Sequence, residues 1–338
     1  MDHLSLVALF KQFPDEDAAT RCLEEQRWPH GERFCPHCGC IGSVQDVPAA
    51  RPMPYRCCEC KKYFSLRTGS VMERSQIPLH KWLVAAFLMM RGKSVSSVQL
   101  GRDLGITQKS AWFMAHRLRY AMKSECGMFS GPVEVDEVYL GGENKNRHWD
   151  KKIRNGRGAV GKTPVIGIKD RETGRVVAGP VENATQYAAE AMIESNVKRG
   201  ADVFTDESVI YHWVRNRQSV NHSRGQYVRG DVDTNGIESI WALLKRGYMG
   251  VYHWWSAKHT HRYVDECAGR YNLRGWARWT HWALFSPACR EDGSRGRIWL
   301  GEAKPAAHLR DPSIFRGRGE ARYAHAAPGD IRSRQECC

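Results

Sequence analysis

The sequence predicts a mixed α/β protein in which two small N-terminal modules precede a larger domain of strands and helices. Three observations favour this fold class: two Cys-x2-Cys pairs near the N-terminus, a helix–glycine–helix pattern after them, and β-rich runs that alternate with helical segments from Gly131 onward. The expected segments are residues 1–75, 76–125, 126–275 and 276–338.

Charge and composition indicate the kind of partner. Lys and Arg number 51 against 37 Asp and Glu, and the formal net charge is +14. This excess favours nucleic acid, because basic side chains gain affinity by releasing counterions from phosphates; a merely basic enzyme is the alternative. The longest apolar run, Trp82 to Met90, is far shorter than the ~20 residues that span a bilayer. We expect a cytoplasmic protein with no membrane segment, whose close cysteine pairs bind metal rather than form disulfides.

The two Cys-x2-Cys pairs are the most specific local signal in the chain. A tetrahedral zinc ion takes four thiolates, and each pair presents two sulfurs from one tight turn. The spacing is typical of a zinc ribbon. Such a zinc is structural, because four protein ligands leave no open position for water. Cys58 lies inside the second pair and is the alternative to Cys57, which keeps the spacing to Cys60. The expected ligands are Cys35, Cys38, Cys57 and Cys60.

The next segment, residues 76–125, is predicted to be helical. Leu100 and Leu104 mark a short helix, Gly105 makes a turn, and Thr107 can cap a second helix. This pattern predicts a helix-turn-helix DNA-binding region, with an ordinary pair of antiparallel helices as the alternative. The side chains expected to face a DNA groove are polar or basic: Gln108, Lys109, Ser110 and Arg117.

The third segment predicts an α/β domain. We expect a strand over 133–140, a hairpin over 164–181, a helix over 185–198, a strand over 201–205 and a helix over 235–245. This order is found in RNase H-like domains and is also compatible with other α/β folds.

Three acidic residues fall where these elements are expected to converge. Asp136 lies within the first strand, Asp206 directly follows the later strand, and Glu238 lies one turn into the last helix. A carboxylate among apolar residues is costly unless neutralised, and two divalent cations would neutralise it while promoting phosphodiester exchange. The alternatives are an edge-strand residue, a helix N-cap and a solvated helix residue. Glu134 and Glu137 are rivals, and a period of two places Glu134 with Asp136 and Glu137 on the opposite face.

Several motifs in these segments resemble one family. They are Val135-Asp-Glu-Val-Tyr-Leu-Gly-Gly142, Thr205-Asp-Glu207, the stretch from His222 to His253 that contains Asn235-Gly-Ile-Glu238, and Arg262-Tyr263 with Glu266, Arg270 and Asn272. Together with the cysteine pairs, they resemble bacterial insertion-sequence transposases of the DDE superfamily, in the zinc-ribbon-bearing ISXO-type branch. The resemblance extends from about residue 20 to residue 275.

The resemblance implies an RNase H-like catalytic core whose metal-binding triad is Asp136, Asp206 and Glu238. It further implies Mg2+ or Mn2+ as the catalytic cofactor, terminal inverted repeats as the substrate, and a homo-oligomer that assembles on paired DNA ends. The reaction would be strand cleavage at the transposon ends followed by strand transfer into target DNA. Asn235, Lys245 and His253 would lie beside the triad, where they would contact DNA phosphate or orient a carboxylate.

Two features depart from the family pattern. Asp233 stands where the pattern has His, and residues 286–338 carry scattered Arg, Gly and Pro with few apolar residues, a composition typical of a disordered basic tail. A catalytically inactive DNA-binding regulator derived from a transposase is therefore the alternative function, and a structure-specific nuclease is a third.

Overall fold

The protein is described from a computed structural model. The structure describes residues 5–29, 31–50, 52–91, 94–123, 127–142, 144–154, 159–219 and 234–274. The predicted tail, 276–338, and Asp233 lie outside these residues. Within the described ranges, we find no helix with the length and apolar character needed to cross a membrane.

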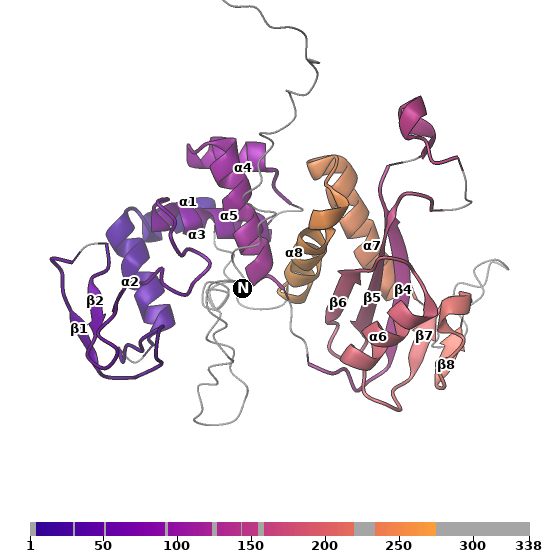
Figure 1. The fold of residues 1–338 in the computed structure, drawn as a ribbon, viewed down its shortest axis with the longest axis horizontal. Coiled ribbons are helices and arrows are strands. Elements are labelled where there is room, and N and C mark those ends of the chain that lie inside the picture. Colours follow the sequence, from indigo (N-terminus) through magenta and orange to yellow (C-terminus); the bar gives the residue numbers. More distant parts are fainter. Residues whose placement is uncertain are drawn as a thin grey trace, which may run out of the picture. The chain divides into compact units, whose positions relative to one another are not determined.

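The N-terminal elements are helices with a small antiparallel sheet between them (Figure 1). Asp15 caps the second helix by accepting a hydrogen bond from the Ala18 backbone amide at 2.8 Å. The strands follow the order β1-β2-β3, with β2 in the middle. The elements are α1 (Leu6–Gln12), α2 (Glu16–Arg27), β1 (Val44–Asp46), β2 (Tyr55–Cys57), β3 (Tyr63–Phe64), α3 (Leu79–Arg91), α4 (Ser97–Leu104) and α5 (Gln108–Ala121).

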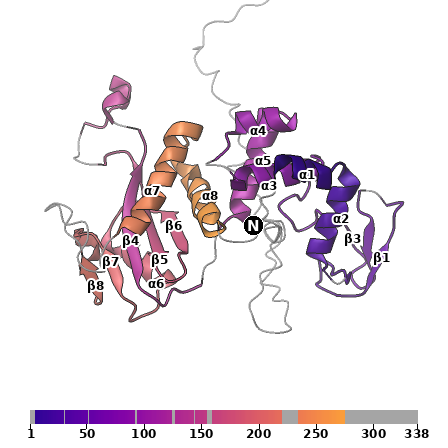
Figure 2. The same ribbon diagram turned by 180° about the vertical axis from the view of Figure 1, so that it is seen from behind.

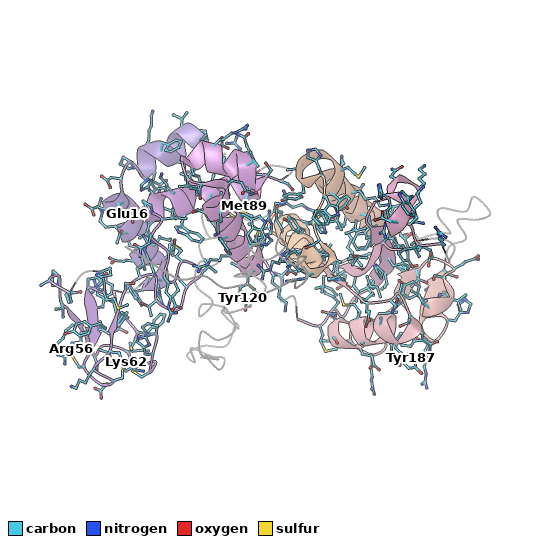
Figure 3. All side chains as sticks on the ribbon, turned by 45° about the horizontal axis from the view of Figure 1, so that its top comes forward. Glu16, Arg56, Lys62, Met89, Tyr120 and Tyr187 are labelled. Carbon is cyan, nitrogen blue, oxygen red and sulfur yellow. The ribbon has the colours of Figure 1, made fainter. Side chains whose placement is uncertain are left out.

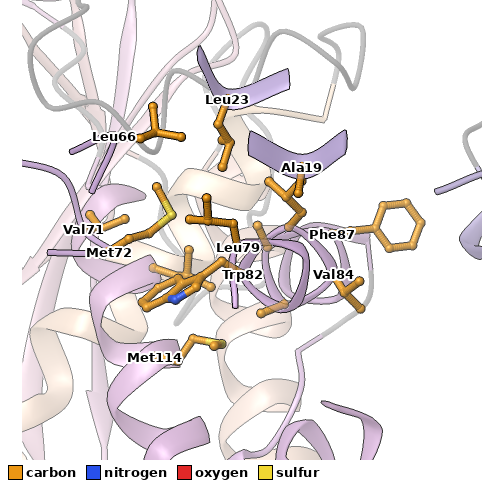
Figure 4. Close-up of a cluster of buried hydrophobic side chains, with 14 of the residues drawn as sticks. Ala19, Leu23, Leu66, Val71, Met72, Leu79, Trp82, Val84, Phe87 and Met114 are labelled. Carbon is orange, nitrogen blue, oxygen red and sulfur yellow. The ribbon is translucent and has the colours of Figure 1, made fainter. Parts of the chain in front are cut away.

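One hydrophobic core joins all of these elements. Its buried side chains extend from Leu9 to Met122 and include residues of the small sheet. Figure 4 shows Trp82 of α3 among Met72, Leu79 and other members of this cluster. Residues on both sides of the predicted boundary at residue 75 therefore share a core, and the boundary itself stays a prediction.

The helix–glycine–helix segment forms as its pattern predicts. Gly105 ends α4 in the left-handed region (φ 60°), and its amide donates to the carbonyls of Gly101 and Arg102. Thr107 caps α5 by accepting from the Ser110 amide at 3.1 Å. Leu100 and Leu104 are buried, so the turn holds the two helices against the core.

The larger sheet has the order β6-β5-β4-β7-β8 among the described strands. The pairs β4–β5 and β5–β6 are antiparallel, whereas β4–β7 and β7–β8 are parallel. The elements of this region are β4 (Val133–Leu140), β5 (Thr163–Asp170), β6 (Val176–Pro180), α6 (Gln186–Asn196), β7 (Val203–Thr205), β8 (Arg217–Ser219), α7 (Asn235–Gly247) and α8 (Thr260–Asn272).

Helices cover both faces of this sheet. Figures 1 and 2 show α6 on one face and α7 and α8 on the other. Val133 and Val135 of β4 belong to the core with α6, whereas Val138 and Leu140 belong to the core with α7 and α8. Alternate residues of β4 therefore point to opposite layers, as the period of a strand requires.

Candidate functional site

The centre of the candidate site is the second half of β4. Asp136 pairs with Gly167 of β5, and Glu137 pairs with Ile166. On its other side, β4 pairs with the parallel strand β7 only at Val133 and Glu134. Beyond that point β4 runs on past the end of β7, and this leaves room beside it for side chains from both of its faces.

Asp206 enters this space directly after β7. One carboxylate oxygen of Asp136, Glu137 and Asp206 each lies within 4.8 Å of the others, and these three residues are the carboxylate cluster. The Asp206 Oδ1 atom also accepts a hydrogen bond from the Ser208 amide at 3.0 Å. Because β7 ends beside the middle of its parallel neighbour β4, the residue that follows β7 comes next to Asp136.

Asp136 is held from the α7 layer. The Trp241 indole N–H donates to Asp136 Oδ2 at 2.9 Å, and the ring lies over Gly167, where a Cβ would come within 2.4 Å of it. Burial, with Glu137 and Asp206 nearby, raises the pKa of Asp136 to about 7. The indole therefore fixes the position of a carboxyl group that is costly to ionise without a cation.

Glu137 is held from the opposite layer. The Tyr211 hydroxyl donates to Glu137 Oε2 at 2.7 Å, and the Tyr211 side chain is fully buried. Burial raises the pKa of Glu137, and the charge of Asp206 raises it further. Three carboxylates that repel one another in a half-buried site form a donor set of hard oxygen atoms, which suits Mg2+ or Mn2+. The residues therefore fit a divalent cation.

The other acidic residues of the region lie elsewhere. Glu238 is exposed on α7, is not part of the carboxylate cluster, and accepts a hydrogen bond from the Thr234 hydroxyl at 3.0 Å. Glu134 of β4 is buried against the start of α7. It accepts a hydrogen bond from the Ile237 amide at 2.7 Å and forms an ion pair with Arg171 at 2.9 Å. The structure thus brings two of the three predicted residues together and adds Glu137.

From the sequence alone, Glu137 is only an alternative to Asp136 as the metal-binding carboxylate of this strand. Its signal was position: it follows Asp136 directly near the end of a strand, where both faces can reach one space. The period of two was correct, since Glu134 and Asp136 contact α7 and Glu137 contacts Tyr211.

The predicted DNA-binding residues occupy different environments. Gln108 and Lys109 are exposed at the start of α5. The side-chain amide of Gln108 also donates a hydrogen bond to the Ser97 hydroxyl at 3.0 Å. Ser110 is partly exposed beside the Thr107 cap. Asn235 and Lys245 are exposed at the two ends of α7. Their contacts with DNA stay predictions.

Arg117 differs from the other predicted DNA contacts. Its guanidinium donates to the Val71 carbonyl at 3.2 Å and the Glu73 carbonyl at 2.7 Å, and burial lowers its pKa. These bonds favour a structural role, in which Arg117 ties α5 to the chain segment before α3.

The cysteines form the second candidate site. Sulfur atoms of Cys35, Cys38, Cys40 and Cys57 lie within 4.8 Å of one another, and all of these residues are free thiols. Cys60 Sγ lies 3.7 Å from Cys35 Sγ, and Cys38 Sγ lies 3.6 Å from Cys57 Sγ. Sulfurs at the corners of a zinc tetrahedron are about 3.8 Å apart, so these separations fit zinc.

Tight turns aim the sulfur atoms inward. The amides of His37 and Cys60 point at the sulfurs of Cys35 and Cys57, both at 3.4 Å, and Gly39 turns the chain with φ 77°. Five thiols compete for the four positions of a tetrahedral ion, because Cys40 Sγ lies 3.1 Å from Cys57 Sγ. Cys58 is not part of this cluster.

Substituting single cysteines should identify the ligands. We expect Cys57→Ser to lose bound zinc and to loosen the buried Tyr55 and Phe64 around it, because zinc-binding energy is folding energy in such a small module. Cys58→Ser should keep about one zinc per chain. The measurement is zinc content by elemental analysis alongside thermal unfolding. Full zinc in Cys57→Ser would contradict this assignment, and comparing Cys40→Ser with Cys60→Ser decides the fourth ligand.

Comparison with known proteins defines the class. Residues 128–272 match the family model of the ISXO2-like transposase domain, and residues 14–63 match that of the transposase zinc-ribbon domain. The first range contains the carboxylate cluster, and the second contains the cysteine cluster. A zinc-ribbon module and a transposase domain in one chain define a transposase.

A relative supports the same assignment over most of the chain. The uncharacterized protein in transposable element ISH50 of Halobacterium salinarum is 30% identical over 249 residues, which cover 70% of this chain and 84% of the relative. The chain belongs to the family of ISXO2-like transposases.

Proposed function

We propose that this protein cuts DNA at the terminal inverted repeats of an insertion sequence and joins the freed ends to target DNA. The observation that carries the proposal is that Asp136 in the middle of β4 meets Asp206 just after the parallel strand β7, inside the range that matches transposases. The net charge of +14 supports a polyanionic substrate.

We also propose that the domain is RNase H-like and that α4 and α5 form a helix-turn-helix. The sheet order β6-β5-β4-β7-β8, with β5 antiparallel to its neighbours and helices on both faces, supports the first assignment. The Gly105 turn and the exposed Gln108 and Lys109 support the second.

Asp136 and Asp206 would hold the catalytic cations, and Glu137 would complete the donor set. When bound, Mg2+ or Mn2+ supplies an activated hydroxyl and stabilises the leaving oxygen of an in-line displacement. Trp241 keeps the Asp136 carboxyl group in place, and the Tyr211 hydroxyl does the same for Glu137.

Glu238 would act from α7 as the third member of the triad. Residues three apart share one side of a helix, and Trp241, three residues after Glu238, contacts Asp136. This spacing supports a placement of Glu238 on the side of α7 nearest the carboxylate cluster, from which a change of rotamer would turn its carboxylate toward the cations.

The test is a Mg2+-dependent cleavage assay on labelled DNA from the gene's own flanks. We expect wild type to cut at the repeat boundary, and Asp136→Ala and Asp206→Ala to lose cleavage by roughly a thousandfold, since several kcal/mol of transition-state stabilisation disappear. End binding should stay nearly unchanged, because it depends on the N-terminal modules.

Two further variants separate the acidic residues that remain. Glu238→Gln should also lose cleavage, and Glu137→Gln should show the same loss if Glu137 binds metal. Specific end binding without cleavage by wild type would identify an inactive DNA-binding regulator. Cleavage of branched DNA regardless of end sequence would identify a structure-specific nuclease.

A further inference from the structure

A projecting segment separates β4 from β5 and contains none of the residues of the carboxylate cluster. Its described residues, 144–154 and 159–162, are called the arm. In Figure 1 its helical turns lie beyond the upper end of β4. Asp136 lies four residues before Leu140, so the end of β4, from which the chain continues into the arm, is about 13 Å along the strand direction from Asp136.

Polar contacts give the arm a defined shape. The Asn144 side chain bonds both backbone groups of Ile153, donating to its carbonyl at 2.8 Å and accepting from its amide at 3.1 Å. The Arg147 guanidinium donates to the Gly161 carbonyl at 2.8 Å, and Gly161 (φ 72°) leaves it room, because a Cβ there would come within 2.5 Å of it. Hydrogen bonds therefore stabilise the shape of the arm, and none of its described side chains is buried.

The surface of the arm combines positive charge with one large aromatic ring. Lys145, Lys152 and Arg154 are exposed, and the acidic Asp150 is paired with the neighbouring His148. Trp149 is 69% exposed, although its ring would gain from burial. Cations beside an exposed indole are the combination that binds nucleic acid, where the cations meet phosphates and the ring stacks on a base.

We propose that the arm binds the DNA next to the cleavage site, with Lys145, Lys152 and Arg154 on phosphates and Trp149 stacked on an unpaired base. The 13 Å from Asp136 to the end of β4 corresponds to about four base pairs, so the arm beyond it meets DNA a few base pairs from the scissile phosphate. Charge decides the partner, because exposed cations match DNA and would repel a second copy of the same arm. The inference rests on the proposed function for the location of the cleavage site.

Binding is measured with the full-length protein in Ca2+ buffer, so that affinity is read without cleavage. The probes are a duplex from the gene's flank and the same duplex with an unpaired 2-aminopurine about four base pairs from the repeat boundary. Affinity falls as salt rises, and the plot of log affinity against log salt has a negative slope. The double variant Lys152→Ala/Arg154→Ala should make this slope less steep by about 1.8, because two phosphate contacts are lost. The matched control is Lys198→Ala/Arg199→Ala, exposed residues after α6, whose slope should equal that of wild type.

Trp149→Ala tests the stacking. We expect a loss of about 5- to 150-fold in affinity for the unpaired probe and loss of its fluorescence quenching, whereas Trp149→Phe restores most of both. Tyr187→Ala is the control, because that ring is 82% exposed on α6 and points away from the domain (Figure 3). Wild-type affinity, slope and quenching in the arm variants would overturn the inference.

The failure of one proposal can be told from the failure of the other. If wild type does not cut end DNA but the arm variants lose affinity and salt slope, the arm still binds DNA and the transposase proposal fails. If wild type cuts and the arm variants bind normally, only the arm proposal fails. Sedimentation adds a third outcome: if Trp149→Ala turns a dimer into a monomer with unchanged DNA affinity, the ring packs between copies and the inference is wrong.

Discussion

Replacing Glu266 with Gln is expected to lower the free energy of unfolding by roughly 3–5 kcal/mol, because it leaves a buried guanidinium without its counter-charge. Arg119 of α5 is 2% exposed, and its Nε atom lies 2.6 Å from Glu266 Oε2 of α8. Burial alone would lower the pKa of Arg119, but the charge of Glu266 more than offsets this and raises it above its usual range. Arg119 therefore keeps its charge inside the protein.

Controls can separate charge from the loss of one hydrogen bond. The Tyr252 hydroxyl donates to both Glu266 carboxylate oxygens at 2.8 Å, so Tyr252→Phe should cost only about 0.5–1.5 kcal/mol. Asp46→Asn breaks the exposed pair with Arg33 and should cost at most ~1 kcal/mol. Urea unfolding in the presence of zinc measures all of these. A cost below 1 kcal/mol for Glu266→Gln would mean that the pair does not hold α5 against α8.

This pair bears on how the protein is organised. Arg119 lies in the predicted DNA-binding segment and Glu266 in the family's transposase range, 147 residues apart in sequence. A Cβ at Gly269 of α8 would come within 2.4 Å of the Met122 carbonyl, so the end of α5 lies directly against α8. Side chains thus cross the boundary predicted between residues 125 and 126, and α5 is anchored in the layer that also contains Trp241.

Replacing Gly167 with Ala is expected to reduce cleavage about a hundredfold and to destabilise the protein by about 1–3 kcal/mol. The new Cβ would lie 2.4 Å from the Trp241 Cη2 atom and 3.1 Å from Ile237 Cδ1. Gly167 is in the middle of β5, which is paired on both sides, so Trp241 must move. The hydrogen bond from the Trp241 indole N–H to Asp136 would be lost, and the Asp136 carboxyl group would no longer be held in position.

A neighbouring glycine and a second-site change provide the comparison. A Cβ at Gly179 of β6 meets only Met192 Cε at 3.9 Å, an ordinary contact, so Gly179→Ala should leave stability and cleavage close to those of wild type. Gly167→Ala combined with Trp241→Phe should recover stability, because the smaller ring makes room, but should not recover cleavage, because Phe has no N–H donor. Wild-type cleavage in Gly167→Ala would show that Trp241 does not position Asp136.

The fold was predictable where local rules decide it. The strand over 133–140 has the predicted bounds because its alternating Val and Leu side chains face two layers. The helix start at Thr107 was readable because capping is a contact within one turn. The short strand β8 was not predicted, since it is stabilised by pairing with β7 rather than by its own sequence, Arg-Gln-Ser.

The sequence by itself determined the motifs that contain their partners nearby: the cysteine pairs, the glycine turn, and the presence of carboxylates at strand ends. Only the tertiary structure decided which carboxylates meet. Glu137 joins Asp136 and Asp206 because β4 extends past the end of β7, whereas Glu134 accepts a hydrogen bond from the Ile237 amide at the start of α7. The ion pair between Arg119 and Glu266 was equally beyond sequence reasoning. Periodicity assigns a side chain to a face, but the distance between two side chains depends on where neighbouring elements end, which distant parts of the chain decide.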